Sequence, residues 1–300
     1  MSATVQLIRE VLEYSERFRG ARFVIQIASP VIDHPALGAL VADLVRLQKA
    51  GINMLLVPGA GTRIDEVLRR YQIDFQVHRG VRISSSEAIP FIKMAAFDVA
   101  NRLMTLLSRH RSNAVIGNWV RAKAVGVRGG VDYQDTGTVA GIDREMVEAT
   151  LREDLIPIFP CIGWSANGRP YNLSSRELAA ALAVNLEAEK LFFVSDSSGI
   201  TGTGFIVPEG VSTTEDGRIS RMDVDEADRF LSGNSDRAEE DAVEIVRLAR
   251  EAAQHGVDRV HILDGTQDGA IPLEVFSLAG GGTMVHARAW ESLRPAANQD

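Results

Sequence analysis

The stretch RFVIQIASPVIDHP, residues 22–35, joins an apolar, β-branched run to a turn of small residues. The run predicts a buried strand. GINMLLVPGAGTRIDEVLRR, residues 51–70, repeats the pattern and leads through Gly59-Ala60-Gly61 into a helix. Junctions of this kind usually cradle a phosphate, because a helix N-terminus follows the loop. Neither loop carries a lysine or arginine, however, and the first basic residue is Arg63, inside the second helix. The sequence therefore leaves open whether the phosphate site works or is a remnant.

Strands and helices alternate along the rest of the chain. Expected helices cover residues 5–18, 35–51, 62–71, 85–110, 175–188, 238–256 and 269–280. Expected strands cover residues 22–27, 52–57, 113–120, 124–128, 137–142, 155–160, 190–196, 259–263 and 282–287, with a turn-rich stretch at 201–225. This alternation predicts an α/β fold with a mostly parallel sheet covered on both faces. Ligands of such sheets bind beyond the carboxyl ends of the strands.

Composition excludes several classes of protein. A chain of 300 residues with 45% apolar content can bury a large core, in one α/β domain or two lobes. No apolar run approaches the ~18 residues of a membrane span, and the N-terminus does not resemble a signal peptide. The net charge of −8 argues against nucleic acid as a partner. One cysteine, Cys161, excludes an internal disulfide. We expect a cytoplasmic protein without metal or cofactor.

An ordered set of motifs resembles one known family over nearly the whole chain. These motifs are FVIQIAS, LLVPGAGTRID, GVRISSSEAIPFIKMAAFDVANRL, NGRPYNLSSRELAAALAVNLEAEKLFFVSDSSGI, GVDRVHILDG and LEVFSLAGGGTMV. They resemble the amino acid kinase superfamily, and within it the kinase-like, arginine-sensing domain of bacterial N-acetylglutamate synthase, a relative of acetylglutamate kinase. The resemblance implies an α/β/α sandwich with a mostly parallel central sheet and an added N-terminal helix.

The resemblance also implies a division of the chain. Residues 1–20 would form an interlocking helix, and residues 21–300 the kinase-like domain. That domain would have an N-lobe over about 21–160 and a C-lobe over about 161–290. Residues 291–300 would begin a linker. We expect no acetyltransferase domain in this chain.

Three departures from the family concern catalysis. Active members end the first strand with a lysine, followed by a glycine pair that wraps the transferred phosphate. Gln26, Ala28 and Ser29 stand there in this chain. The family aspartate that opens the helix after the YN strand is replaced by Arg176. The second catalytic lysine, expected near Ile245, is absent. Phosphoryl transfer depends on neutralising charge, so we predict that the kinase site is silent and that no residue is catalytic.

Some ligand-binding positions of the family persist. Arg82 and Asn172 match the residues with which the kinases hold the carboxylate and amide of acetylglutamate, and Gly59 and Gly61 belong to the second glycine loop. Arginine suits a carboxylate because its planar fork donates two hydrogen bonds. A structural ion pair for Arg82 and a turn-stabilising role for Asn172 remain open alternatives.

The N-terminal helix implies a feedback site. In the synthases and arginine-inhibited kinases this helix swaps between dimers to build a hexamer, and L-arginine lies between the helix and the C-terminal lobe. A carboxylate can bind the guanidinium of arginine, and a lysine its α-carboxylate. Each candidate residue also has an ordinary structural interpretation. By resemblance, the effector residues are Tyr14, Lys190, Glu274, Ser277, Gly280 and Gly282.

Three hypotheses follow. The first is a catalytically silent regulatory domain of arginine biosynthesis, which binds L-arginine, forms homo-oligomers and acts on an acetyltransferase domain or subunit. The second is a purely structural hexamerisation module without an effector site. The third is a divergent small-molecule kinase that uses Arg176 or Arg63 as a substitute cation and binds a nucleotide with Mg²⁺.

Overall fold

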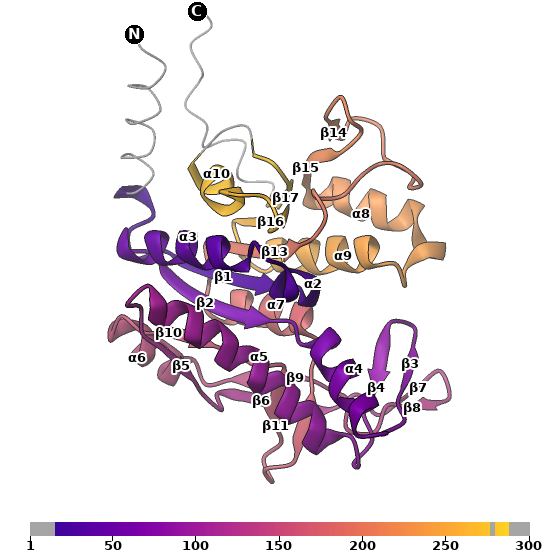
Figure 1. Cartoon of the computed structure of the whole chain (residues 1–300). Coiled ribbons are helices and arrows are strands. Elements are labelled where there is room, and N and C mark those ends of the chain that lie inside the picture. Colours follow the sequence, from indigo (N-terminus) through magenta and orange to yellow (C-terminus); the bar gives the residue numbers. More distant parts are fainter. Residues whose placement is uncertain (1–15, 277–279, 288–300) are drawn as a thin grey trace, which may run out of the picture.

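A nine-stranded sheet forms the centre of the computed structural model, which describes residues 16–276 and 280–287 (Figure 1). Strand β1 (Arg22–Ile27) lies in its middle and pairs in parallel with β2 (Asn53–Pro58) and with β13 (Lys190–Ser195). Almost every side chain of these three strands is buried, as expected for parallel strands covered on both faces. The predicted α/β fold with a mostly parallel sheet is confirmed.

The strand order of the main sheet is β14-β15-β17-β16-β13-β1-β2-β10-β5. Two pairs, β14 with β15 and β16 with β17, are antiparallel, and the others are parallel. The remaining strands of this sheet are β5 (Ala114–Ile116), β10 (Ile156–Ile158), β14 (Ser212–Thr213), β15 (Ile219–Asp223), β16 (Arg259–Asp264) and β17 (Thr283–His286).

Helices cover both faces of this sheet, because successive side chains of a strand point to opposite faces. Phe23, Ile25 and Ile27 of β1 belong to one hydrophobic core and Val24 to the other. The first core is completed by α2 (Ser29–Asp33), α3 (Leu37–Lys49), α4 (Gly61–Arg70), α5 (Ile89–Arg109) and α10 (Ala270–Phe276). The second is completed by α6 (Arg144–Arg152), α7 (Ser175–Asn185), α8 (Val224–Gly233) and α9 (Asp241–Gln254).

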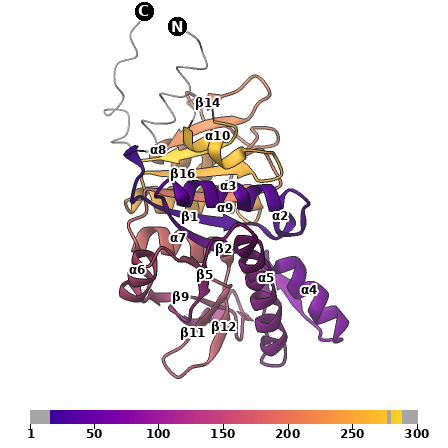
Figure 2. The same ribbon diagram turned by 60° about the vertical axis from the view of Figure 1, so that its left-hand side comes forward.

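A four-stranded sheet and two hairpins surround the carboxyl ends of the central strands. Both views place the small sheet, in the order β12-β11-β6-β9, beneath the main sheet (Figures 1 and 2). The rings of His78 and Tyr133 meet edge to face at 6.3 Å and connect the two hairpins. The strands of the small sheet are β6 (Val120–Ala124), β9 (Gly137–Ile142), β11 (Ile162–Trp164) and β12 (Pro170–Asn172). The hairpins are β3 (Gln76–His78) with β4 (Val81–Ile83) and β7 (Val127–Arg128) with β8 (Val131–Asp132).

Three short helices were not expected from the sequence, namely α2, α6 and α8. The start of α8 falls inside the stretch 201–225, which composition alone marks as turns. The side chains of Asp223 and Glu226 form a capping box there, and this local signal fixes the start of the helix. The helix expected over residues 5–18 lies mostly outside the described residues. Within the described ranges, no helix has both the length and the apolar character that crossing a bilayer requires.

Candidate functional site

A cleft of about 550 Å³ opens at the carboxyl ends of β1 and β2, where α/β sheets bind their ligands. The N-termini of α4 and α7 and the two hairpins contribute to its walls. Ile245 lies elsewhere, in the second core with 6% of its surface exposed, whereas its neighbour Glu244 lines the cleft. The sequence-predicted residues that line the cleft are Gln26, Ala28, Ser29, Gly59, Gly61, Arg82, Asn172 and Arg176.

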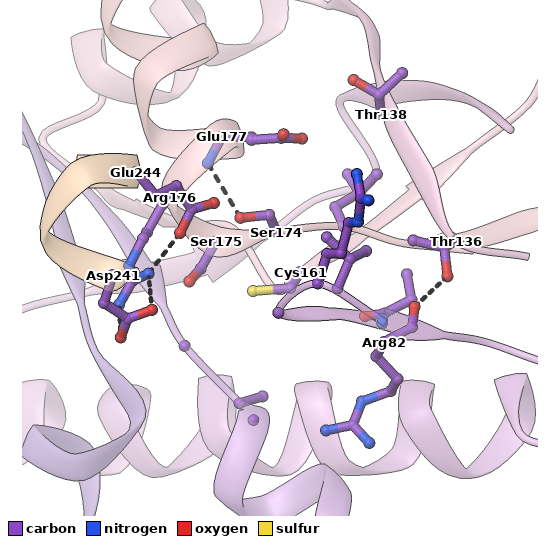
Figure 3. A pocket seen from close by; sticks show the side chains of 18 of the residues that line it. Arg82, Thr136, Thr138, Cys161, Ser174, Ser175, Arg176, Glu177, Asp241 and Glu244 are labelled. Atoms are coloured by element: carbon purple, nitrogen blue, oxygen red, sulfur yellow. Dashed lines mark hydrogen bonds and ion pairs between the residues drawn. The ribbon is translucent and has the colours of Figure 1, made fainter. Parts of the chain in front are cut away.

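Neutral groups occupy the part of the cleft where kinases of the family would have a lysine. Gln26 is 3% exposed, and its Nε2 donates a hydrogen bond to Ser175 Oγ at 3.2 Å. The Cys161 thiol lies beside Ser175 (Figure 3) and donates to the carbonyl oxygen of Pro58 at 3.1 Å. Burial raises the pKa of this thiol to about 12, so it stays protonated at neutral pH. These three side chains supply no positive charge for a transferred phosphate.

The two loops expected to hold a phosphate pack against each other. The amide of Gly59 donates to the carbonyl oxygen of Ile27 at 2.7 Å, and a Cβ at position 59 would lie 3.0 Å from the amide nitrogen of Ser29. Glycine permits this close approach. The Ser29 hydroxyl accepts a hydrogen bond at 2.9 Å from the amide of Thr62, in the first turn of α4. A donor that would otherwise be available to a phosphate is therefore bound within the chain.

Arg176 lies between two carboxylates of α9 (Figure 3). Its guanidinium donates two parallel hydrogen bonds to Asp241, at 2.8 and 3.0 Å, and a third to Glu244 at 2.6 Å. Burial by itself would lower the pKa of Arg176, but the hydrogen bonds and charges of both acids outweigh it and raise the pKa. The first turn of α7 disfavours a cation. Asp241 and Glu244 of α9 offset this unfavourable position by binding the guanidinium of Arg176.

A double-mutant cycle measures how strongly this arginine holds α7 to α9. Arg176→Met and Asp241→Asn should show a coupling energy of about 1 kcal/mol in urea unfolding, because the pair is bidentate and only 19% of the Arg176 side chain is exposed, although Asp241 is 80% exposed. The matched pair Arg79 and Glu239 has both side chains more than half exposed. Its coupling should stay below about 0.5 kcal/mol. Equal coupling in the two cycles would contradict the special role of the Arg176 cluster.

Arg82 and Asn172 both have structural partners. The guanidinium of Arg82 forms an ion pair with Asp65 of α4 and lies 4.5 Å from the centre of the Phe75 ring. The Asn172 amide donates to Ser84 Oγ at 3.1 Å. Among the described residues, Nη1 of Arg82 is buried without a hydrogen-bond partner. Arg82 therefore forms a structural ion pair, and it also keeps one nitrogen atom that could bind an anion.

A second polar cluster lies between α10 and the β16–β17 pair. Glu274, 9% exposed, is bonded at 2.8 Å through Oε1 to Nδ1 of His261. A Cβ at Gly280 would lie 2.7 Å from the same oxygen, and the backbone of Gly282 helps to lower the pKa of the Glu274 carboxylate. The charge of Lys190 also acts on this carboxylate. The structure thus brings together four of the six predicted effector residues; Tyr14 and Ser277 lie outside the described residues.

His261 belongs to this cluster but was not predicted from the sequence. It is 2% exposed, stacks on Phe192 with ring centres 5.0 Å apart, and has its pKa lowered to about 4, chiefly by burial. The ring is therefore neutral, and Nδ1–H must be the donor to Glu274 because a carboxylate can only accept. Burial alone would raise the pKa of Glu274, but His261 and Lys190 lower it. The only signal in the sequence is a histidine within the apolar strand RVHIL, residues 259–263.

Two polar atoms of the cluster lack hydrogen bonds. Nε2 of His261 and Oε2 of Glu274 are buried and have no hydrogen-bond partner among the described residues. Buried polar atoms without partners are rare in folded proteins and require an explanation. A ligand with several N–H donors would satisfy the carboxylate oxygen.

Lys190 begins β13 at the edge of this cluster. It is 2% exposed, and its Nζ lies 4.8 Å from the centre of the Phe18 ring and 5.7 Å from that of Phe23. Both are cation–π distances. Burial is the main reason why the pKa of Lys190 falls to about 7. Phe18 thus connects the cluster to the segment that precedes β1.

Residues 21–264 match the sequence profile of the amino acid kinase family. The chain belongs to this family. It is 31% identical to the amino-acid acetyltransferase of Escherichia fergusonii, over 99% of this chain and 67% of that protein. The N-acetylglutamate synthase of Neisseria gonorrhoeae, complexed with coenzyme A and L-arginine, superposes with a TM-score of 0.83 at 26% identity. Its complex with coenzyme A and N-acetylglutamate gives a TM-score of 0.82, also at 26% identity.

This chain aligns with only part of each of the longer synthase chains. The superpositions cover 95% of this chain but only 66% and 64% of the two synthase chains. This chain thus spans about two thirds of the relatives that it matches. The resemblance to the kinase-like part of N-acetylglutamate synthase is confirmed.

Proposed function

We propose that this chain is a catalytically silent kinase-like regulatory domain, which binds L-arginine as the feedback effector of an N-acetylglutamate synthase system. One observation carries the proposal: the carboxylate of Glu274 and the amine of Lys190 belong to a single buried cluster, in which Oε2 of Glu274 has no partner among the described residues. The arginine complex of the Neisseria gonorrhoeae relative supports it.

The two groups of the cluster match the two ends of the ligand. A guanidinium donates charge-assisted hydrogen bonds to a carboxylate such as Glu274, and an ammonium such as that of Lys190 attracts the α-carboxylate. Gly280 lies directly against Glu274, because a Cβ at position 280 would overlap the carboxylate. A Cβ at position 282 would instead overlap the backbone of β16. The chemistry of Glu274 and Lys190 therefore favours an amino acid with a cationic end.

The composition of the cleft near the end of β1 supports catalytic silence. Gln26, Ser175 and Cys161 are neutral, and Arg176 is bound by two acids of α9. Among the described residues that line the cleft, none is a lysine. Phosphoryl transfer requires cations placed on the transferred group. The divergent-kinase hypothesis would need one of the other arginines that line the cleft to supply that charge, namely Arg79, Arg82, Arg128 or Arg247.

The proposal includes assembly and a regulated partner. Residues 1–20 would interlock protomers into dimers and hexamers, and an acetyltransferase domain or subunit would respond to arginine. The relatives that support this are named amino-acid acetyltransferases and are longer than this chain. The structural-module hypothesis predicts the same assembly without a bound effector.

A thermal-shift titration tests the proposal. L-arginine at about 100 times its Kd should add about 2.7 kcal/mol to the free energy of unfolding, whereas D-arginine and ATP with Mg²⁺ should add nothing. N-acetylglutamate in a parallel titration tests whether the positions of Arg82 and Asn172 still bind it. Stabilisation by ATP with Mg²⁺ would contradict the silent kinase site. Stabilisation by none of these ligands would favour the structural module.

A further inference from the structure

We propose that the binding of a carboxylate ligand at Lys190 is coupled to the uptake of one proton by its amine, so that effector affinity depends on pH. The coupling rests on the function proposed above and adds a regulatory property to the same site. It makes the domain respond to pH as well as to arginine.

The surroundings of Lys190 make its charged form less favourable than it would be in water. The side chain is 2% exposed and starts a strand flanked in register by Phe23 of β1 and Arg259 of β16. The aromatic faces of Phe18 and Phe23 stabilise a cation only modestly. Among the described residues, no carboxylate lies within ion-pair distance of Nζ. Glu274, which attracts the ammonium over a longer distance, is already hydrogen-bonded to His261.

The charges around Lys190 come from each neighbouring element and partly cancel. Two cations oppose the ammonium and two anions favour it, while the ring of His261 is neutral because of its low pKa. Burial is the largest effect, and it leaves the pKa of Lys190 at about 7. The groups concerned are Arg17 of the N-terminal segment, Asp258 before β16, Arg259 in β16 and Glu274 in α10.

A carboxylate placed against Nζ would stabilise the ammonium and raise the pKa of Lys190. At pH 6 the amine is already protonated in the free protein, so binding takes up no proton. Above the free pKa of about 7, the free amine loses its proton while the bound amine keeps it. The affinity should then fall by up to about tenfold for each further pH unit.

Isothermal titration of the intact chain with L-arginine tests the coupling. Proton uptake is obtained at pH 6, 7 and 8 from pairs of buffers with different ionisation enthalpies. We expect uptake near zero at pH 6, uptake approaching one proton at pH 8, and a Kd about tenfold weaker at pH 8 than at pH 6. Agmatine, which has the guanidinium but no carboxylate, should bind without this proton uptake.

Lysine NMR supplies a test that needs no ligand. The chain has four lysines, at positions 49, 93, 123 and 190, so ¹³C-labelled lysine gives few signals. One signal should titrate near pH 7 and vanish in Lys190→Met, whereas it should persist in the control Lys49→Met at an exposed site. Arginine binding by Lys190→Met should be weaker and independent of pH between 6 and 8.

The outcomes separate the two proposals. Binding of L-arginine without proton uptake at pH 8, or equal uptake by Lys190→Met, would overturn the coupling and leave the effector function standing. Absence of a lysine signal titrating near pH 7 would also overturn the coupling. Failure of L-arginine to bind at any of the three pH values would overturn the proposed function, and the coupling with it.

Discussion

Replacing Gly282 by alanine should destabilise the fold by about 3 kcal/mol or more, whereas the same change at Gly281 should alter stability by less than about 0.5 kcal/mol. A Cβ at position 282 would overlap the carbonyl oxygen of Ile262 and lie 3.1 Å from Cβ of Leu263. A Cβ at position 281 would meet nothing within 4 Å. The two variants therefore share their chemistry and differ only in the space available.

The obstacle at Gly282 cannot move aside cheaply. Ile262 belongs to β16, which is hydrogen-bonded to β13 on one side and to β17 on the other, so its carbonyl oxygen is fixed in the sheet. Overpacking against a rigid backbone costs more than overpacking against a flexible side chain. Urea unfolding followed by circular dichroism measures the loss as a lower midpoint at unchanged slope. Equal midpoints for the two variants would show that β17 can shift away from β16.

The sequence predicted the central sheet because its strands are continuous apolar runs separated by helices of sufficient length. Residues 22–27, for example, form β1 as expected. Helix α2 was missed because it has only five residues, and α8 because it begins inside the stretch where turns were expected. Five residues are too few to show a helical period, whereas the capping box of Asp223 and Glu226 could have revealed α8.

The candidate sites show a similar limit. The order of the motifs shared with the family placed Lys190 and Glu274 in one site, and the structure brings them into one cluster. His261 was missed because its bond to Glu274 joins residues on two separate elements, 13 positions apart. The sequence likewise showed that Arg176 replaces an acid, but the contact with Asp241 spans 65 positions. Such contacts come from the tertiary fold and leave no local pattern.

Replacing Glu274 by glutamine should weaken L-arginine binding by about 100-fold while lowering stability by only about 1 kcal/mol. Glutamine keeps the size of glutamate, and its Oε1 can still accept the hydrogen bond from Nδ1 of His261. It removes the charge that a bound guanidinium would pair with. Loss of one partner of a buried charged pair typically costs about 2–5 kcal/mol, and 1.4 kcal/mol corresponds to a tenfold change in Kd.

Two controls separate this electrostatic effect from a structural one. Glu251→Gln neutralises an acid that is paired with Arg247 on the exposed side of α9, and it should leave arginine binding unchanged. L-citrulline has the shape of arginine but a neutral end. The wild-type chain should strongly prefer L-arginine to L-citrulline, and Glu274→Gln should lose most of that preference. A variant that still discriminates between them as the wild type does would show that Glu274 does not contact the guanidinium.

The strength of this prediction depends on the protonation state of His261. With its pKa lowered to about 4, the ring is neutral near pH 7 and does not neutralise the carboxylate to which it donates. Glu274 thus keeps its full charge, and its pKa is lowered. A protonated His261 would already satisfy that charge and leave little for a ligand. The neutral histidine holds Glu274 in place through one oxygen, while Oε2, buried and without a partner among the described residues, is the atom that a guanidinium would bind.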